Sequence, residues 1–438
     1  MNKHIHFNEQ KPCPCGRVHH SSLQACIIKE GALSELPHYV KQFGAKNAYL
    51  LSDVNTFPLA GENIIHNLAQ HGINCVSYVF NQAHLEPDEQ AVGSAVMHYD
   101  KSLDMVITLG SGVLNDIGKI ISSLAKIPHI VVATAPSMDG YASASSSMAL
   151  DGVKVTLGTK CPEVVIGDLN IVKNAPLHML KSGLGDMLAK YVSICEWRIS
   201  HLITGEYYCE NIASYIRDAL ARCIEAAPGL LQREPESVKA VLEGLVACGS
   251  AMEYAGLSRP ASGIEHYFSH IWDMRGLEFG TKTDLHGIQC AIGTRYALMA
   301  YEQIKTITPD FEKASAFVKS FDLDDWFSTL KAFIGTGSGA MIALDQKEQK
   351  YNPATHQERV KHILDHWDDI LSIINEELPS LEEFDALLNR LQMPKTLTDI
   401  GLDESILPLT FKASKDIRDK YVLSRLAWDL GVLNEIKL

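Results

Sequence analysis

A chain of 438 residues is longer than a single hydrophobic core usually allows, so two domains are expected. The composition, 46% hydrophobic and 21% charged, is that of a globular protein and argues against a disordered chain. The formal net charge of −14 argues against a nucleic-acid-binding protein, whose affinity comes largely from Lys and Arg facing phosphates. A small anionic substrate stays compatible with this charge, because a few cations in a pocket outweigh a distant acidic surface.

The N-terminal segment 1–20 contains no apolar run long enough for a signal peptide or a membrane span. We therefore expect a cytoplasmic protein that does not insert into a membrane. The ten cysteines are spread over apolar segments and loops, which is typical of reduced thiols rather than of a disulfide framework. Cys13, Cys15, His19 and His20 form a cluster of metal-ligand types, but no second ligand pair follows at related spacing. An ordinary N-terminal turn is favoured, with a structural zinc site as the alternative.

The first part of the chain alternates short apolar runs with amphipathic stretches. The apolar runs predict strands over 48–52, 75–80, 104–109 and 129–133, and the stretches predict helices over 60–71 and 114–126. Strands alternating with helices indicate a parallel sheet with crossover helices, whose ligands bind at the carboxyl ends of the strands.

The second part of the chain has long helical patterns and few strand signals. After the extended segment 164–168 and Pro176, helices are predicted over 177–197, 207–227, 237–256, 263–274 and 286–304. The expected fold is therefore an α/β domain with a parallel sheet over residues 1–176, followed by an all-α domain over 177–438. The active site is expected in the cleft between the two domains.

A candidate dinucleotide loop follows the predicted strand 104–109. Gly110 and Gly112 let the backbone approach a pyrophosphate, and the N-terminus of the next helix attracts its charge. The third glycine of the usual fingerprint is replaced by Asn115, so a turn that binds nothing is an equal alternative. The segment 133–147, which is rich in hydroxyls and carries Asp139, follows the next strand. If this segment is buried, its hydroxyls and carboxylate need hydrogen-bond partners. A solvated surface loop is the alternative.

Asp53 ends the first predicted strand of the series. A carboxylate at this place binds the ribose hydroxyls of an adenosine and repels a 2′-phosphate, which favours NAD over NADP. Helix capping is the other role for an Asp at a strand end.

The helical part carries the residue types of a metal site. Ser262 and Glu265 predict a capping box and a helix start, after which His266 and His270 share one helix face. Thr283 predicts a further helix start that places a histidine, His286, in the first turn.

Asp186 is a candidate carboxylate ligand to accompany these histidines. It lies within an apolar helical run, where a lone acid is costly unless it is paired or bound to a metal. Asp186 with two histidines would give a divalent cation one oxygen and two nitrogens and leave positions open for substrate, as in catalytic sites. The spacing does not identify such a triad by itself, and each histidine alone is more often an ordinary core or surface residue.

These segments together resemble one known family. They read Gly-Ser-Gly-x-x-Asn-Asp over 110–116, Thr-Ala-Pro-Ser-Met-Asp-Gly-Tyr-Ala-Ser over 134–143, Gly-x-Gly-Asp ending at Asp186, Ser-Gly-x-Glu-His-x-x-Ser-His over 262–270, and Leu-His-Gly over 285–287. The chain resembles the family of iron-containing alcohol dehydrogenases, glycerol dehydrogenases and dehydroquinate synthases, most closely its bacterial sn-glycerol-1-phosphate dehydrogenase branch. The resemblance covers most of the chain, although the glycine loop is shared by the whole superfamily.

The resemblance implies a Rossmann-like NAD-binding domain, a helical metal- and substrate-binding domain and a homodimer. It implies that the metal is held by Asp186, His266 and His286, that NAD is contacted by Asp53, Gly110, Gly112, Val113, Leu114, Asn115, Asp116, Thr134, Ser137 and Ser143, and that Asp139, Asp186 and His270 face the substrate.

The reaction that the resemblance implies is reduction of dihydroxyacetone phosphate to sn-glycerol 1-phosphate by NADH or NADPH. One zinc, nickel or ferrous ion would act as the Lewis acid. Asp186 and His270 are the expected catalytic residues, with His270 either relaying a proton or only binding a substrate hydroxyl. Lys160 and Arg259 border the matching segments and are candidate phosphate contacts, or ordinary surface charges.

Three other functions are alternatives to this one. The first is a glycerol or other polyol dehydrogenase with an unphosphorylated substrate. The second is a protein that binds NAD or a sugar phosphate without catalysis. A dehydroquinate synthase is disfavoured, since that branch has Glu where this chain has Asp186.

Overall fold

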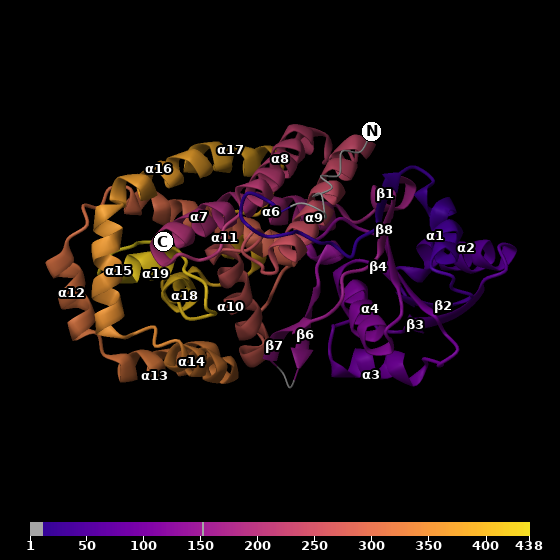
Figure 1. Cartoon of the computed structure of the whole chain (residues 1–438), viewed down its shortest axis with the longest axis horizontal. Helices are drawn as coiled ribbons and strands as arrows, with labels where there is room; N and C mark the ends of the chain where they lie inside the picture. Colours follow the sequence, from indigo (N-terminus) through magenta and orange to yellow (C-terminus); the bar gives the residue numbers. More distant parts are fainter. Residues whose placement is uncertain (1–11, 151–152) are drawn as a thin grey trace. The chain divides into compact units, whose positions relative to one another are not determined.

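The computed structural model describes residues 12–150 and 153–438, which form two compact units. Unit 1 is the chain up to Met187 together with Asn211–Ser258, and unit 2 is Leu188–Glu210 together with Arg259–Leu438. Figure 1 shows strands in the first part of the chain and helices through the rest, as the sequence predicts.

Unit 1 contains a parallel sheet (Figure 1). Among the described residues it has six strands in the order β1-β8-β5-β4-β2-β3. Their bounds are β1 Ala25–Lys29, β2 Asn47–Asp53, β3 Asn74–Phe80, β4 Met105–Gly110, β5 His129–Ala133 and β8 Val164–Asp168. The four strands predicted from apolar runs are confirmed, and the extended segment 164–168 is a fifth. The first strand, β1, was not predicted.

Helices cover both faces of the sheet because successive strand residues point to opposite sides. Leu50 of β2 packs on one side with Val40 of α1 and Ile64 of α2. Its neighbour Tyr49 packs on the other side with the helices α3 and α4, where Ile117 belongs to the same apolar cluster. The helices of unit 1 are α1 Leu36–Gln42, α2 Phe57–Gln70, α3 Glu89–Met97, α4 Gly112–Ala125, α5 Leu169–Val172, α6 Leu177–Leu188, α8 Glu210–Ala226 and α9 Pro235–Ala255, with the terminal residues Leu188 and Glu210 assigned to unit 2.

The segment between β5 and β8 is more ordered than a loop. It forms a short 3-10 helix, η2 (Gly140–Ala142), and then an antiparallel pair, β6 (Ser145–Leu150) with β7 (Val153–Gly158). Helix α9 packs against η2 and β1.

The two units differ from the single division predicted at Pro176. Residues 211–258 belong to unit 1 because α9 packs on the sheet: a β-carbon on Gly167 of β8 would come within 2.5 Å of Leu242 Cδ2 in α9. The assignment of NAD binding to residues 1–176 and of metal and substrate binding to 177–438 stays a prediction.

Among its described residues, unit 2 contains helices and no strands. Its helices are α7 Lys190–Thr204, α10 Ile264–Phe279, α11 His286–Ile304, α12 Phe311–Ser320, α13 Leu323–Ile334, α14 Ser338–Lys347, α15 Pro353–Asp365, α16 Trp367–Glu377, α17 Leu381–Arg390, α18 Leu407–Ser414 and α19 Leu423–Asp429. The single helix predicted over 177–197 is instead two helices, α6 and α7, that meet at Ala189. Helices α10 and α11 pack against each other, and α7 and α18 also contact α10.

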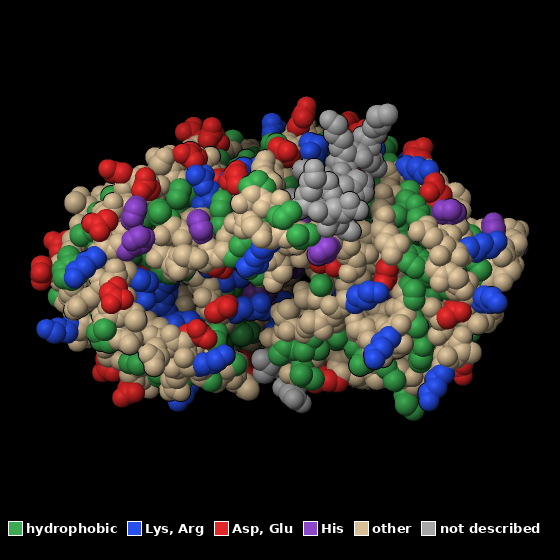
Figure 2. Space-filling view, viewed as in Figure 1, with side chains coloured by type: hydrophobic (Ala, Val, Ile, Leu, Met, Phe, Trp, Pro, Cys, Tyr) green, Lys and Arg blue, Asp and Glu red, His purple; other side chains and the backbone are tan. Residues whose placement is uncertain are grey.

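Charged side chains of both signs lie on the surface of the chain. On the face drawn in Figure 2, acidic and basic side chains are interspersed rather than gathered into one broad basic patch. A search of the described helices finds none with both the length and the apolar character needed to span a membrane.

Candidate functional site

The predicted dinucleotide loop joins the sheet to helix α4 in unit 1. Strand β4 ends at Gly110 and α4 begins at Gly112, with Ser111 between them as a residue that makes no side-chain cap bond. The first N–H groups of α4 are therefore not taken up by that side chain and suit an anionic ligand. A β-carbon on Gly112 would come within 3.3 Å of Met138 Cγ, so glycine lets the segment after β5 approach the loop closely.

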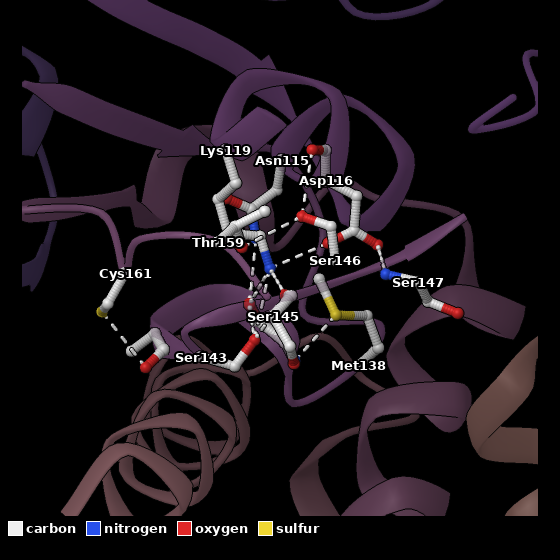
Figure 3. Close-up of polar contacts among 12 residues, drawn as sticks. Asn115, Asp116, Lys119, Met138, Ser143, Ser145, Ser146, Ser147, Thr159 and Cys161 are labelled. Atoms are coloured by element: carbon white, nitrogen blue, oxygen red, sulfur yellow. Dashed lines mark hydrogen bonds and ion pairs between the residues drawn. The ribbon is translucent and has the colours of Figure 1, made fainter. Parts of the chain in front are cut away.

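A buried lysine that sequence reasoning missed joins the two predicted cofactor segments. The Lys119 side chain is fully buried on α4 and forms an ion pair with Asp116 at 2.8 Å. Its ammonium also donates to the Gly140 carbonyl and the Ser143 hydroxyl, each at 3.2 Å, and to the Ser145 carbonyl. Figure 3 shows this side chain reaching across to the segment after β5. No periodic pattern distinguishes such a lysine from a surface one, which is why it was missed.

Asn115 and Asp116 also hold that segment. Asn115 Nδ2 donates to the Gly140 carbonyl at 3.0 Å, and Asp116 Oδ2 accepts from the Ser147 backbone at 3.2 Å (Figure 3). Burial raises the pKa of Asp116, and Lys119 opposes this shift. The two side chains predicted to contact NAD thus have a structural role in fixing the neighbouring segment.

The hydroxyl-rich segment is buried, so the alternative of a solvated loop is wrong. Thr134, Ser137, Asp139 and Ser143 are each less than a tenth exposed. The Thr134 backbone donates to the Gly110 carbonyl at 3.1 Å, which places this segment beside the glycine loop.

Asp53 stands at the end of β2, where the sequence predicted a ribose contact. Its Oδ1 accepts from the backbone of Asn55 at 2.9 Å and of Thr56 at 2.8 Å. The local capping role is therefore present, and ribose binding stays a prediction.

Asp186 lies near the end of α6, fully buried, and is connected to a second predicted site residue. Its Oδ2 accepts from the Asp139 backbone at 2.9 Å, and one turn earlier Ser182 Oγ donates to the Ser137 carbonyl at 2.9 Å. A β-carbon on Gly183 would come within 1.9 Å of the Pro136 carbonyl oxygen, so only glycine permits this close approach. The structure thus brings Asp139 and Asp186 together within unit 1.

Three imidazoles gather within unit 2. The ring centroids of His266 and His286 are 5.0 Å apart, and those of His270 and His286 are 6.0 Å apart with nearly parallel planes. His266 and His270 share a face of α10, as predicted, and His286 is the first residue of α11. A β-carbon on Gly293 would come within 2.6 Å of the Glu265 carbonyl oxygen, so glycine allows α11 to lie close to α10.

Each of two rings has its Nδ1 held by a protein oxygen. His266 Nδ1 donates to Glu265 Oε1 at 2.8 Å, and His286 Nδ1 lies 3.1 Å from Ser269 Oγ. Donation from Nδ1 puts the lone pair of His266 on Nε2, the nitrogen that can then ligate a metal.

The predicted capping box is wrong. Helix α10 has Gly263 as its N-cap with no side-chain cap bond, and Glu265 accepts from the Gly263 backbone at 2.7 Å. The carboxylate is directed to His266, whereas the Ser262 carbonyl accepts from Lys420. Thr283 is not the N-cap of α11 either, because that position is Leu285.

Cys290 is a ligand type that sequence reasoning missed. Its Sγ lies 3.5 Å from His286 Nε2, and ligand atoms of His266, His286 and Cys290 all lie within 4.8 Å of one another. Burial alone would raise the pKa of this thiol, but His266 and His286 lower it overall. The signal was present in the sequence, since positions 286 and 290 are one helical turn apart.

The two candidate phosphate contacts behave differently. Lys160 has a half-exposed side chain and pairs with Glu163. Arg259 is buried and already occupied: it donates to Glu206, to the Tyr421 carbonyl at 2.9 Å and to Ser200 at 3.0 Å. Arg259 is therefore not a surface charge.

The chain is similar in sequence to proteins named glycerol-1-phosphate dehydrogenase [NAD(P)+]. A glycerol-1-phosphate dehydrogenase [NAD(P)+] of Halalkalibacterium halodurans is 32% identical over 66% of this chain and 74% of its own length. One of Bacillus licheniformis is 32% identical over 70% of this chain and 82% of its own. The chain belongs to the glycerol-1-phosphate dehydrogenase family. This confirms the predicted branch.

The wider family and the fold agree with this membership. The model of the family described as iron-containing alcohol dehydrogenase matches residues 27–176. A solved glycerol dehydrogenase of Schizosaccharomyces pombe has a TM-score of 0.63 at 17% identity, covering 96% of this chain and 91% of its own. A maleylacetate reductase of Rhizobium sp. has the same score at 16% identity, covering 96% and 97%. At these identities the two structures show the fold alone, and they confirm the predicted fold class.

Proposed function

We propose that this chain reduces dihydroxyacetone phosphate to sn-glycerol 1-phosphate, using NADH or NADPH and one divalent metal ion. The observation that carries the proposal is the group of His266, His286 and Cys290 in a chain of this family. His266 is buried and His286 is partly buried, and imidazoles at this spacing are ligands for zinc, nickel or ferrous iron. The names of the relatives do not say which metal is used.

The proposed metal ligands are Asp186, His266 and His286. Asp186 is a fully buried carboxylate. The next residue, Met187, is the last residue of unit 1 before the chain enters unit 2. Glu265 holds His266 and Ser269 contacts His286, the type of support that orients ligating histidines in metal sites. One carboxylate and two imidazoles leave positions open, which suits catalysis rather than a closed structural site. When bound, such an ion would supply Lewis-acid stabilisation at the carbonyl oxygen of the substrate.

Asp139 and His270 are proposed to contact the substrate. Asp139 is fixed relative to Asp186 by its backbone hydrogen bond, so the two carboxylates are positioned together. His270 stacks beside His286 at 6.0 Å and is proposed to supply the proton that the new hydroxyl needs, directly or through water.

The cofactor is proposed to bind at the start of α4. The backbone of Gly110, Gly112, Val113 and Leu114 would face the pyrophosphate, since Ser111 does not cap that helix with its side chain. Asn115 and Asp116 shape the site by holding the segment that carries the other proposed contacts, which are Thr134, Ser137 and Ser143. Asp53 is proposed to bind the adenosine ribose and to favour NAD. We also propose a homodimer, which sedimentation of the purified protein would test.

Removal of one imidazole tests the metal assignment. His266→Ala is expected to lose the bound metal, measured by elemental analysis, and to lose turnover while keeping its circular dichroism spectrum. His38→Ala, at an exposed histidine of α1, is the matched control and should keep both. Retention of metal and activity in His266→Ala would show that the ligand assignment is wrong.

A second candidate function is a glycerol or other polyol dehydrogenase with an unphosphorylated substrate, since the family model that matches residues 27–176 is described only as iron-containing alcohol dehydrogenase. NADH oxidation should be compared with dihydroxyacetone phosphate and with dihydroxyacetone. A higher kcat/KM for the phosphate ester, with a chiral assay that gives the 1-phosphate, supports the proposal. Preference for dihydroxyacetone supports the second function, and NADH binding without turnover on either ketone supports a sensor.

A further inference from the structure

A second group of metal-ligand side chains lies in the N-terminal segment of unit 1. Ligand atoms of Cys13, Cys15 and His19 all lie within 4.8 Å of one another. The chain turns back on itself here: the Cys13 backbone donates to the Arg17 carbonyl and the Gly16 backbone to the Cys13 carbonyl, both at 2.8 Å. Gly16 has a φ of 83°, which favours glycine, so this turn is built into the sequence. His20, grouped with these residues in the sequence, is exposed.

The His19 ring is oriented as a metal ligand is. It is 2% exposed, and its Nδ1 lies 3.0 Å from the Tyr254 carbonyl, which can only accept, so Nδ1 donates and the lone pair lies on Nε2. Nε2 is 3.4 Å from Cys15 Sγ. Sulfur and nitrogen atoms bound to one tetrahedral zinc ion lie about 3.5 Å apart, given usual zinc bond lengths. The pair therefore already has the separation of two zinc ligands.

Cys13 lies next to a hydrogen-bond donor of the kind that stabilises a metal-bound thiolate. Asn211 Nδ2 lies 3.2 Å from Cys13 Sγ and is positioned to donate to it. Asn211 follows Cys209 by two residues in the sequence, and Cys209 is a buried cysteine. A fourth ligand is therefore available close to Asn211 along the chain. The ligand spacing within the N-terminal segment did not predict it.

We propose that Cys13, Cys15 and His19 bind a structural zinc ion, with Cys209, which precedes Asn211 by two residues in the chain, as the fourth ligand. Three thiolates and one imidazole fill all four tetrahedral positions, so this site has none open for a substrate and differs from the proposed catalytic centre. The proposal does not depend on the proposed dehydrogenase activity.

The zinc would link the N-terminal segment to Cys209, which directly precedes α8. That segment already contacts α9 through Arg17, which donates to the Ala255 carbonyl at 3.3 Å, and through Ser21 and Ser22, which both donate to the Glu253 carboxylate. Because a zinc ion bound by four side chains contributes directly to folding, its loss should lower the Tm of the whole protein.

Metal content measures the site directly. The full-length protein and a Cys13→Ser/Cys15→Ser variant should be purified with zinc and analysed for zinc per chain. We expect the variant to hold about one equivalent less than the natural protein and to melt at a lower temperature. A Cys26→Ser/Cys75→Ser variant changes two part-buried cysteines elsewhere in unit 1 and should keep its zinc content. Equal zinc content in the natural protein and the Cys13→Ser/Cys15→Ser variant would overturn the proposal.

A second measurement needs no variant and covers the case in which the substituted chain fails to fold. The natural protein is alkylated with iodoacetamide before and after incubation with a chelator, and each cysteine is followed by mass spectrometry. Cys13 and Cys15 should be protected until the chelator removes the zinc. Rapid alkylation of both without chelator, or a Cys13–Cys15 disulfide in fresh protein, would contradict zinc binding and indicate a thiol–imidazole pair or a redox pair instead.

Discussion

The Glu265 carboxylate accepts a hydrogen bond from Nδ1 of His266 at 2.8 Å. Both side chains are buried, and the neighbouring carboxylate of Glu196 is buried with them. Burial and the charge of Glu265 raise the pKa of Glu196 to about 8. Two neighbouring buried carboxylates are costly unless positive charge lies nearby, and Arg259, whose charge lowers the pKa of Glu196, supplies part of it. A bound cation would add to it.

Glu265→Gln tests whether this contact supports metal binding. The amide keeps an oxygen that can accept from Nδ1 but removes the negative charge, so we expect metal affinity to fall about 10- to 100-fold. Competition with a chelator measures the change in Kd. Glu278→Gln makes the same charge change at an exposed site of α10 and should leave Kd unaltered. Equal affinities in the two variants would exclude a positioning role for Glu265.

Gly183→Ala should separate α6 from the segment after β5. The new β-carbon would lie 1.9 Å from the Pro136 carbonyl oxygen, so backbone must move and the Asp186 to Asp139 hydrogen bond is strained. We expect a loss of about 1–3 kcal/mol in the free energy of unfolding, together with reduced kcat. Gly93→Ala is the control, because its β-carbon in α3 meets nothing within 4 Å and should stabilise the helix by up to about 1 kcal/mol. An unchanged kcat and stability in Gly183→Ala would argue against the close approach.

A buried histidine predicts acid sensitivity of unit 1. Burial, with Lys119 nearby, lowers the pKa of His129 to about 3. As pH falls below about 6.5, the unfolded chain takes up a proton that the folded chain refuses, so stability present above that pH is lost towards pH 3.

The slope from this one group should be up to about 1.4 kcal/mol per pH unit. His129→Gln can keep the hydrogen bond to Thr108 and should flatten the dependence of urea-unfolding free energy on pH over this window. His66→Gln, at an exposed histidine of α2, should leave the slope as it is. If His129→Gln has the slope of the natural protein, another group is responsible.

Asp53→Asn should relax the preference for NAD over NADP, since the amide removes the charge that repels a 2′-phosphate. The ratio of kcat/KM values for the two cofactors measures the effect. Asp88 caps α3 by accepting from the Ala91 backbone, so Asp88→Asn is a matched change at another capping carboxylate. A cofactor ratio that stays constant in Asp53→Asn would limit Asp53 to its capping contacts with Asn55 and Thr56.

Local patterns predicted the parts of the fold that depend on local sequence. Alternating strands and helices, the face shared by His266 and His270, and the first-turn position of His286 are all set by residues close together in the chain. Strand β1 was missed because its short run Ala-Cys-Ile-Ile-Lys is a strand only through pairing with β8, far along the sequence.

The missed site features share this non-local origin. Lys119 is recognisable as buried only when the carbonyls it reaches after β5 are known. Glu265 looks like a capping partner of Ser262 in the sequence, but in the structure its carboxylate accepts from the Gly263 backbone and from the His266 imidazole. The membership of 211–258 in unit 1 follows from packing of α9 on the sheet, which periodicity does not encode.

The buried ammonium of Lys119 has a consequence for exchanging parts among relatives. It connects α4 to the hydroxyl-rich segment, and two of its four acceptors are the Gly140 and Ser145 backbone carbonyls, whose positions depend on the course of the chain. A chimera that imported residues 110–119 from another dehydrogenase without residues 134–147 would set this charge against a mismatched set of acceptors. Residues 110–119 and 134–147 should therefore be exchanged together in any chimera.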